Sequence, residues 1–170
     1  MTKICKLLFF LDFMHFKETG YPSIGLEYFV FPNGPLATSF WREVKDAIPP
    51  DDFVDKLDLI EKTDELAPGY REIEFRARKN PDLSVFSPRE LEILDNLALM
   101  FGDVKAWQIS EITHLKNAPW DKTKKQKGEK APIDYMLAID KDSKVTREEA
   151  EESLKEYLET LQNFSLRPTE

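Results

Sequence analysis

The sequence predicts a mainly helical α+β fold, a single domain over residues 1–170 that is built around a buried N-terminal helix and includes a small antiparallel β-hairpin. Nearly every residue from Ile4 to Phe16 is apolar, and a helix that is apolar on all sides is a buried one. Capping boxes begin at Ser87 and at Thr146, and each marks the start of a later helix. Apolar and charged residues alternate in the middle of the chain, which is typical of half-buried strands.

The N-terminal helix contains three polar exceptions, Lys6, Asp12 and His15. Asp12 and His15 are three residues apart and share one face, so in a buried helix they must be satisfied by each other or by the backbone. Gly20 stands where a left-handed residue usually ends a helix. Cys5 is the only cysteine, which excludes a disulfide framework, and its place in the helix predicts an inert thiol in a reducing cytosol.

The next residues predict a strand and a stiff turn. Ile24–Phe31 is rich in aromatic and β-branched residues, and Pro32-Asn33-Gly34-Pro35 ends this strand. Pro35 suits the first position of a new helix that runs to Pro49. A rigid turn with aromatic residues at its base loses little entropy on binding, so it is as good a candidate for a binding edge as for a simple connection. The candidate contacts are Tyr28, Phe31, Asn33 and Trp41.

Two half-buried strands are predicted next, joined through Ala67-Pro68-Gly69. Their alternating apolar positions are Leu57 and Leu59 in the first strand and Ile73, Phe75 and Ala77 in the second.

A pair of helices is expected after the strands. The first begins at Ser87, ends at Gly102 and is expected to point Leu91, Leu94, Leu97, Ala98 and Phe101 inward. Asp103 is expected to cap the second helix. The inward residues of this second helix are predicted to be Val104, Trp107, Ile112 and Leu115, with Ile109 further round its surface.

The C-terminal third predicts three shorter units. Pro119-Trp120 opens a lysine-rich segment that ends near Gly128, and Ile133–Ile139 favours a helix. The last helix begins at Thr146 and its tail is expected to fray from Ser165. One face of this helix carries Ala150, Leu154, Leu158 and Leu161.

A polar patch is predicted on the second of the paired helices, where Trp107, Ser110, Glu111 and His114 recur at helical spacing. A carboxylate beside an imidazole suits acid–base chemistry or metal binding. No nucleophile motif and no third ligand at suitable spacing accompanies them, which favours a structural role without a metal or cofactor. The residues interpreted in this way are Asp12, His15, Trp107, Ser110, Glu111, His114 and Trp120.

Charge and hydropathy argue against two classes of protein, general nucleic-acid binders and membrane proteins. A net charge of −8 argues against a general nucleic-acid binder, because phosphate neutralisation requires a basic surface. The one basic run, Lys122–Lys130, is interpreted as a solvated loop. The apolar N-terminal run is too short to span a bilayer and has no signal-peptide cleavage site. We therefore expect a cytoplasmic protein without a membrane partner.

Several segments together resemble one known family. Two segments resemble the opening of the SocA-like or Panacea antitoxin domain, a family that includes phage-associated proteins of the GepA type. They are Lys6–Gly20, with the sequence K-L-L-F-F-L-D-F-M-H-F-K-E-T-G, and Gly25–Pro35, with the sequence G-L-E-Y-F-V-F-P-N-G-P. The resemblance continues to Trp41 and reappears at Ser110–His114 and Pro119-Trp120. It implies a mostly helical cytoplasmic domain that binds and neutralises a toxin protein encoded nearby. For one branch it also implies delivery of the toxin to a cytosolic protease.

The resulting hypothesis is an antitoxin that acts by binding and is not an enzyme. Two alternatives stay open. The first is a small hydrolase or lyase that uses His15 and His114 with Asp12 and Glu111. The second is a nucleic-acid-binding regulator that uses Lys122–Lys130.

Overall fold

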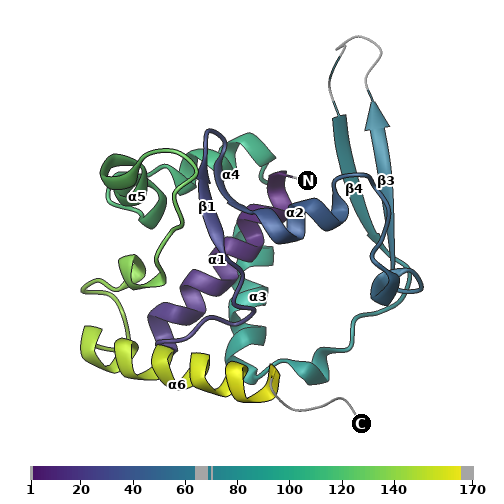
Figure 1. Cartoon of the computed structure of the whole chain (residues 1–170). Coiled ribbons are helices and arrows are strands. Elements are labelled where there is room, and N and C mark those ends of the chain that lie inside the picture. The colour runs from purple at the N-terminus through teal and green to yellow at the C-terminus, as the bar shows by residue number, and fades with distance from the viewer. Residues whose placement is uncertain (1, 64–68, 70, 166–170) are drawn as a thin grey trace.

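Helix α1 (Thr2–Thr19) runs through the middle of the computed structural model, which describes residues 2–63, 69 and 71–165 (Figure 1). One side of α1 contributes Phe9, Phe13 and Phe16 to an apolar cluster with β1 and the C-terminal segments. The other side contributes Leu11 to a second cluster, with α3 and α4. The helix is apolar all round because it is packed on both sides, which confirms the prediction of a buried central helix in a mainly helical α+β fold.

Two strands directly after α1 form a tight hairpin. β1 (Tyr28–Phe31) pairs antiparallel with β2 (Gly34–Ala37), and helix α2 (Thr38–Val44) follows at once. The prediction that Pro35 starts a helix was wrong, because Gly34 adopts φ +98° and returns the chain along β1 after a two-residue turn. The first strand is also shorter than predicted, since the backbone N–H groups just before it bind a side chain of α1 instead of a neighbouring strand.

A second hairpin extends away from the helices (Figure 1). β3 (Leu57–Thr63) pairs antiparallel with β4 (Arg71–Ala77), which confirms the two predicted strands. Residues 67 and 68 of the predicted Ala67-Pro68-Gly69 connection lie outside the described residues. Leu59 and Ile73 pack with Val44 of α2, so the attachment of this hairpin to the molecule runs through one small apolar cluster.

Helix α3 (Pro88–Phe101) begins with the predicted capping box, because the Ser87 hydroxyl accepts from the Glu90 N–H and the Glu90 carboxylate accepts from the Ser87 N–H. Its buried residues are Ile93, Leu97 and Phe101. The predicted inward set contained Leu97 and Phe101 but missed Ile93, and Ala98 is exposed.

Helix α4 (Ala106–Thr113) is rotated relative to the prediction. Lys105, not Asp103, is its N-cap residue, and Ile109 is fully buried whereas Trp107 is 65% exposed and Leu115 is 61% exposed. The buried face also carries Ser110 and Thr113, whose hydroxyls donate to carbonyls of their own helix. A hydroxyl satisfied in this way is buried at little cost, so a count of apolar residues selects the wrong face.

The C-terminal elements close one end of the molecule. α5 (Pro119–Lys127) ends at Gly128, as predicted, and Ile133–Ile139 contains a 3₁₀ turn, η3 (Tyr135–Ala138), where an α-helix was favoured. α6 (Arg147–Ser165) begins with the predicted capping box at Thr146 and crosses the end of α1 (Figure 1). Fraying was expected from Ser165; Ser165 is still the last residue of α6, and residues 166–170 lie outside the described residues. Two short 3₁₀ turns complete the elements, η1 (Asp51–Phe53) and η2 (Leu83–Val85).

Within the described residues, no helix is long and apolar enough to cross a membrane.

Candidate functional site

Asp12 anchors the chain where it enters β1. Its carboxylate is fully buried and accepts hydrogen bonds from three successive backbone N–H groups and two tyrosine hydroxyls. The carboxylate charge and burial raise the pKa of both tyrosines, burial having the larger effect. The donors are the N–H groups of Ile24 at 2.6 Å, Gly25 at 3.2 Å and Leu26 at 3.3 Å and the hydroxyls of Tyr28 at 2.9 Å and Tyr135 at 3.2 Å.

His15 belongs to a different environment from Asp12. Its Nδ1 donates to the Tyr21 carbonyl at 2.9 Å and lies 3.2 Å from the Thr19 hydroxyl. Asp12 and His15 are therefore each satisfied locally, mainly by backbone groups, and no hydrogen bond joins them among the described contacts. This is the second of the two possibilities that the sequence left open for this pair.

The two carbonyls that flank the β1–β2 turn are each held by a side chain from a distant segment. The Trp120 indole Nε1 donates to the Phe31 carbonyl at 3.1 Å. The Lys6 ammonium donates to the Pro35 carbonyl at 2.7 Å. Pro32 and Asn33, between these two carbonyls, are exposed. The turn is thus fixed from beneath and open to solvent at its tip.

Gly34 packs closely against the side chains of Thr113 and Lys6. A Cβ atom at this position would lie 2.6 Å from the Thr113 hydroxyl and 2.8 Å from Cε of Lys6. Its positive φ is also one that other residues rarely adopt. Only glycine therefore fits here without displacing the side chains of Thr113 and Lys6.

Lys6 is the residue at this site that the sequence interpretation missed. Its side chain is 2% exposed, and burial lowers its pKa to about 8. No described carboxylate forms an ion pair with it. A lysine within a helix predicted to be buried on all sides must bury its ammonium, and this was the signal that could have identified it.

His114 completes the cluster beneath the turn. It is the C-cap residue of α4, and its ring stacks on Trp120 with 4.0 Å between centroids. Its Nε2 atom is buried and has no hydrogen-bond partner among the described residues. Burial lowers the pKa of this imidazole, while the nearby Glu111 carboxylate acts in the opposite direction. His114 is therefore mainly neutral at pH 7 and packs as an aromatic ring.

The structure does not bring the two histidines together. His114 lies with Lys6 at one end of α1, and His15 lies nine residues further along, about 14 Å at the rise of an α-helix. His15 and Asp12 are buried in local hydrogen-bond networks, whereas Glu111 is exposed. The described residues contain no cluster of three or more His, Cys, Asp or Glu side chains that could hold a metal ion.

The predicted binding contacts differ in accessibility. Asn33 is exposed at the tip, Phe31 is half-buried, and Trp41 is exposed on α2 beneath the Lys45 ammonium. Tyr28 is buried with its hydroxyl on Asp12, so it presents no surface to a partner. Of the predicted polar patch, only His114 and Trp120 stack on each other, and Trp107 points to solvent.

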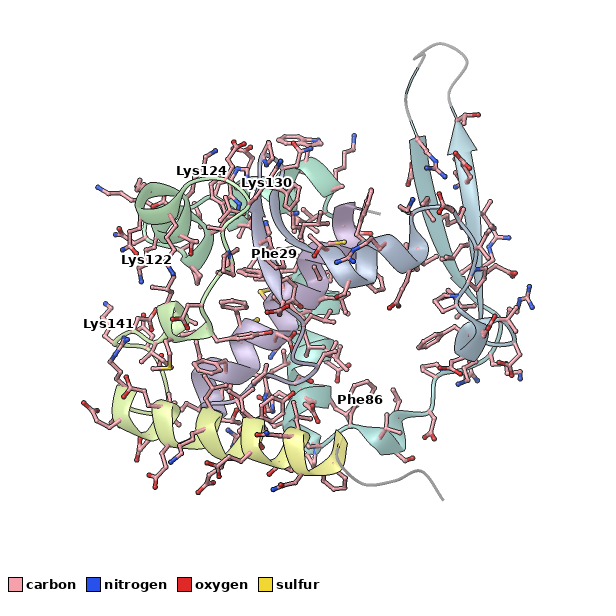
Figure 2. All side chains as sticks on the ribbon, viewed as in Figure 1. Phe29, Phe86, Lys122, Lys124, Lys130 and Lys141 are labelled. Atoms are coloured by element: carbon pink, nitrogen blue, oxygen red, sulfur yellow. The ribbon has the colours of Figure 1, made fainter. Side chains whose placement is uncertain are left out.

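The basic run is largely engaged in local contacts. Lys125 pairs with Asp121 at 2.7 Å, and Lys124 lies over the Trp120 ring at 4.7 Å. Lys122 donates to the Leu137 carbonyl at 3.1 Å. Figure 2 shows Lys122 and Lys124 on α5 and Lys130 on the segment that runs beside β1. These contacts leave the run with less free positive charge than its sequence indicates.

Comparison with known families assigns this chain to one of them. The model of the family described as "Antitoxin SocA-like, Panacea domain" matches residues 4–121, so the chain belongs to the SocA-like Panacea antitoxin family. The match includes α1, both hairpins, α4 and the start of α5, and therefore Lys6, Gly34 and Trp120. Helix α6 lies outside the matched residues. No curated protein and no solved structure matches the chain.

Proposed function

We propose that this protein is an antitoxin that neutralises a toxin encoded nearby by binding it directly, with the β1–β2 turn as part of the binding surface. Membership of an antitoxin family supports the general role. The observation that carries the location is the turn itself, which is exposed at Asn33 and held at both flanking carbonyls. A surface that is already ordered loses little conformational entropy when a partner binds.

Two observations favour binding over catalysis. The histidines that a hydrolase or lyase would use lie at opposite ends of α1, and the neutral His114 ring is packed on Trp120. Acid–base catalysis requires its groups within hydrogen-bond reach of one substrate, about 3 Å from the reacting proton. We therefore propose a non-enzymatic protein.

Nucleic-acid regulation is less well supported than toxin binding. Lys122, Lys124 and Lys125 already contact protein groups, and the chain as a whole is acidic, with a net charge of −8. A basic toxin surface would be attracted to such a protein, whereas a nucleic acid would be repelled.

The test is co-expression with the neighbouring gene. We expect a small protein encoded beside this chain to stop growth when it is expressed alone, and expect the present protein to restore growth and co-purify with it. His114→Gln should restore growth as well as the parent does, because no proton transfer is required. If a stable His114→Gln variant binds the toxin but no longer restores growth, the mechanism is chemical and the binding proposal is wrong.

The same experiment addresses delivery to a protease. Neutralisation by occlusion leaves the toxin level unchanged, whereas delivery lowers it in cells that contain the relevant cytosolic protease. Toxin abundance after synthesis is stopped, compared between cells with and without each cytosolic protease, distinguishes the two forms of the proposal.

A further inference from the structure

The tip of the β1–β2 turn is held by two donors that come from elements far apart in the chain. Lys6 from α1 binds the Pro35 carbonyl, and Trp120 from α5 binds the Phe31 carbonyl. We call this pair of side chains the turn clamp. The residues between the clamped carbonyls, Pro32–Gly34, form the tip, and within the described part of the chain no side chain forms a hydrogen bond to a residue of the tip.

The lysine of the turn clamp is a costly way to make one hydrogen bond. The Lys6 ammonium is buried away from water and donates to the Pro35 carbonyl. No carboxylate among the described residues forms an ion pair with it. An unpaired buried charge destabilises a fold, and the replacement of buried charged groups by apolar side chains of similar volume is often neutral or stabilising. What this unfavourable burial achieves locally is that the turn is held in a fixed position.

Trp120 contributes in a similar way but without a charge. Its ring is buried and stacks on His114, and its one donor group is directed at the turn. A phenylalanine would keep one aromatic ring at this position, and it would lose this donor together with the packing of the second indole ring. The two members of the clamp therefore differ in charge and come from different helices, but both bind carbonyls beside the β1–β2 turn.

We propose that Lys6 and Trp120 are positioning residues for toxin binding, which hold the tip in the conformation that the toxin recognises. This inference rests on the proposed function, and it adds to it the residues that determine the shape of the binding surface. The physical basis is preorganisation, since a tip that is ordered before binding does not lose that freedom on binding.

Two variants and a matched control test this role. Lys6→Met and Trp120→Phe each remove one donor of the clamp. Lys122→Met is the control, because Lys122, which lies on α5 (Figure 2), also donates to a backbone carbonyl, that of Leu137, and this carbonyl is not part of the turn. Backbone order at Asn33 and Gly34 is measured by ¹⁵N relaxation in the free protein. Affinity is measured for the toxin that the co-expression experiment identifies.

Each clamp variant should lower the order parameters at Asn33 and Gly34 from about 0.85 towards about 0.6. Each should also weaken toxin binding about five- to ten-fold, the effect of one lost hydrogen bond. Lys122→Met should change neither quantity. A melting temperature close to that of the parent in all three variants shows that the fold is retained.

A double-mutant cycle separates positioning from a general structural role. If Lys6 acts through the tip, Lys6→Met should weaken binding by less than about two-fold in a protein that already carries Asn33→Ala. A general loss of structure would instead give the same loss of affinity in both backgrounds, and that result would overturn the positioning role.

The remaining outcomes distinguish the two proposals. If the parent protein does not bind the toxin, the proposed function is wrong and the clamp has no part in it. If the parent binds but the clamp variants keep its affinity, whether or not the tip becomes mobile, the proposed function stands and the positioning role is overturned.

Discussion

The two β-hairpins have the same antiparallel pairing but are stabilised in opposite ways. In β1–β2, Val30 and Ala37 are fully buried, and buried polar groups of Asp12, Lys6 and Trp120 bind the adjacent backbone. The β3–β4 hairpin extends from the molecule and contacts α2 through a small apolar cluster (Figure 1). Exposed ion pairs cover its surface, including those of Lys62 with Glu74, Arg71 with Glu61 and Arg78 with Asp58.

The contrast between the two hairpins shows which interactions fix the backbone conformation in this fold. A buried hydrogen bond between a side chain and the backbone fixes one geometry, because any other leaves a polar group unsatisfied. Exposed ion pairs exchange with water and contribute little stability. We therefore expect substitutions around β1–β2 to have large effects and equivalent substitutions in β3–β4 to have small ones.

The largest effect is expected for Asp12→Leu, which leaves three backbone N–H groups and the Tyr28 hydroxyl without their acceptor, while the Tyr135 hydroxyl keeps the Leu26 carbonyl at 2.6 Å. We expect the free energy of unfolding to fall by about 3–5 kcal/mol. Asp58→Leu in the other hairpin is the control, since it removes only an exposed partner of Arg78. Urea denaturation measures both variants, and equal midpoints would contradict the contrast.

The next largest effect on stability is expected when a glycine with positive φ is replaced in each of the two hairpins. Gly34 and Gly69 both have positive φ, but a Cβ at Gly34 would collide with Thr113 and Lys6, whereas no described residue lies within 4 Å of one at Gly69. Gly69→Ala should lose about 1 kcal/mol, the backbone cost alone. Gly34→Ala should lose about 2–3 kcal/mol, because the steric collision is added to that cost. Thermal unfolding of the two variants measures the difference, which disappears if the turn can move away from α4.

Lys6 should make stability depend on pH. Its pKa is lowered to about 8 in the folded protein from 10.5, so above pH 8 the unfolded state binds more protons and stability rises with pH. We expect a gain of about 1 kcal/mol between pH 8 and pH 9. Lys6→Met should lack this gain, and the difference between the two proteins isolates the group. The comparison is limited to pH 8–9 because burial raises the pKa of the Cys5 thiol. At higher pH the thiol ionises more readily in the unfolded protein than in the folded one, which destabilises the fold.

The smallest effect is expected for Lys62→Met in β3. Lys62 pairs with Glu74 at 2.5 Å, but both side chains are partly exposed on the extended hairpin. The melting temperature should change by less than about 2 °C. A larger decrease in calorimetry would show that the ion pairs of β3–β4 act as a network.

Local signals in the sequence predicted much of the fold. The apolar run of α1, the capping boxes at Ser87 and Thr146 and the alternation in β3 and β4 each depend on neighbouring residues, and each was confirmed. The family resemblance was confirmed by the match to residues 4–121.

The features that sequence reasoning missed depend on contacts between distant residues. β2 was missed because Pro35 also suits a helix start, and the choice is made by Gly34 fitting against Thr113 and Lys6. The face of α4 was misjudged because Ser110 and Thr113 satisfy their own hydroxyls. The partner of Lys6 is a backbone carbonyl 29 residues away, which no local pattern indicates.

The single cysteine gives this molecule a built-in reporter of its own unfolding. Cys5 is 1% exposed on α1, the one helix that both large apolar clusters share, and burial raises the pKa of its thiol. A thiol reagent can react with it only when the part of α1 around Cys5 separates from its neighbours. The labelling rate therefore measures the opening of this helix in the unmodified protein, and comparison with amide exchange in β3–β4 shows whether that hairpin opens first.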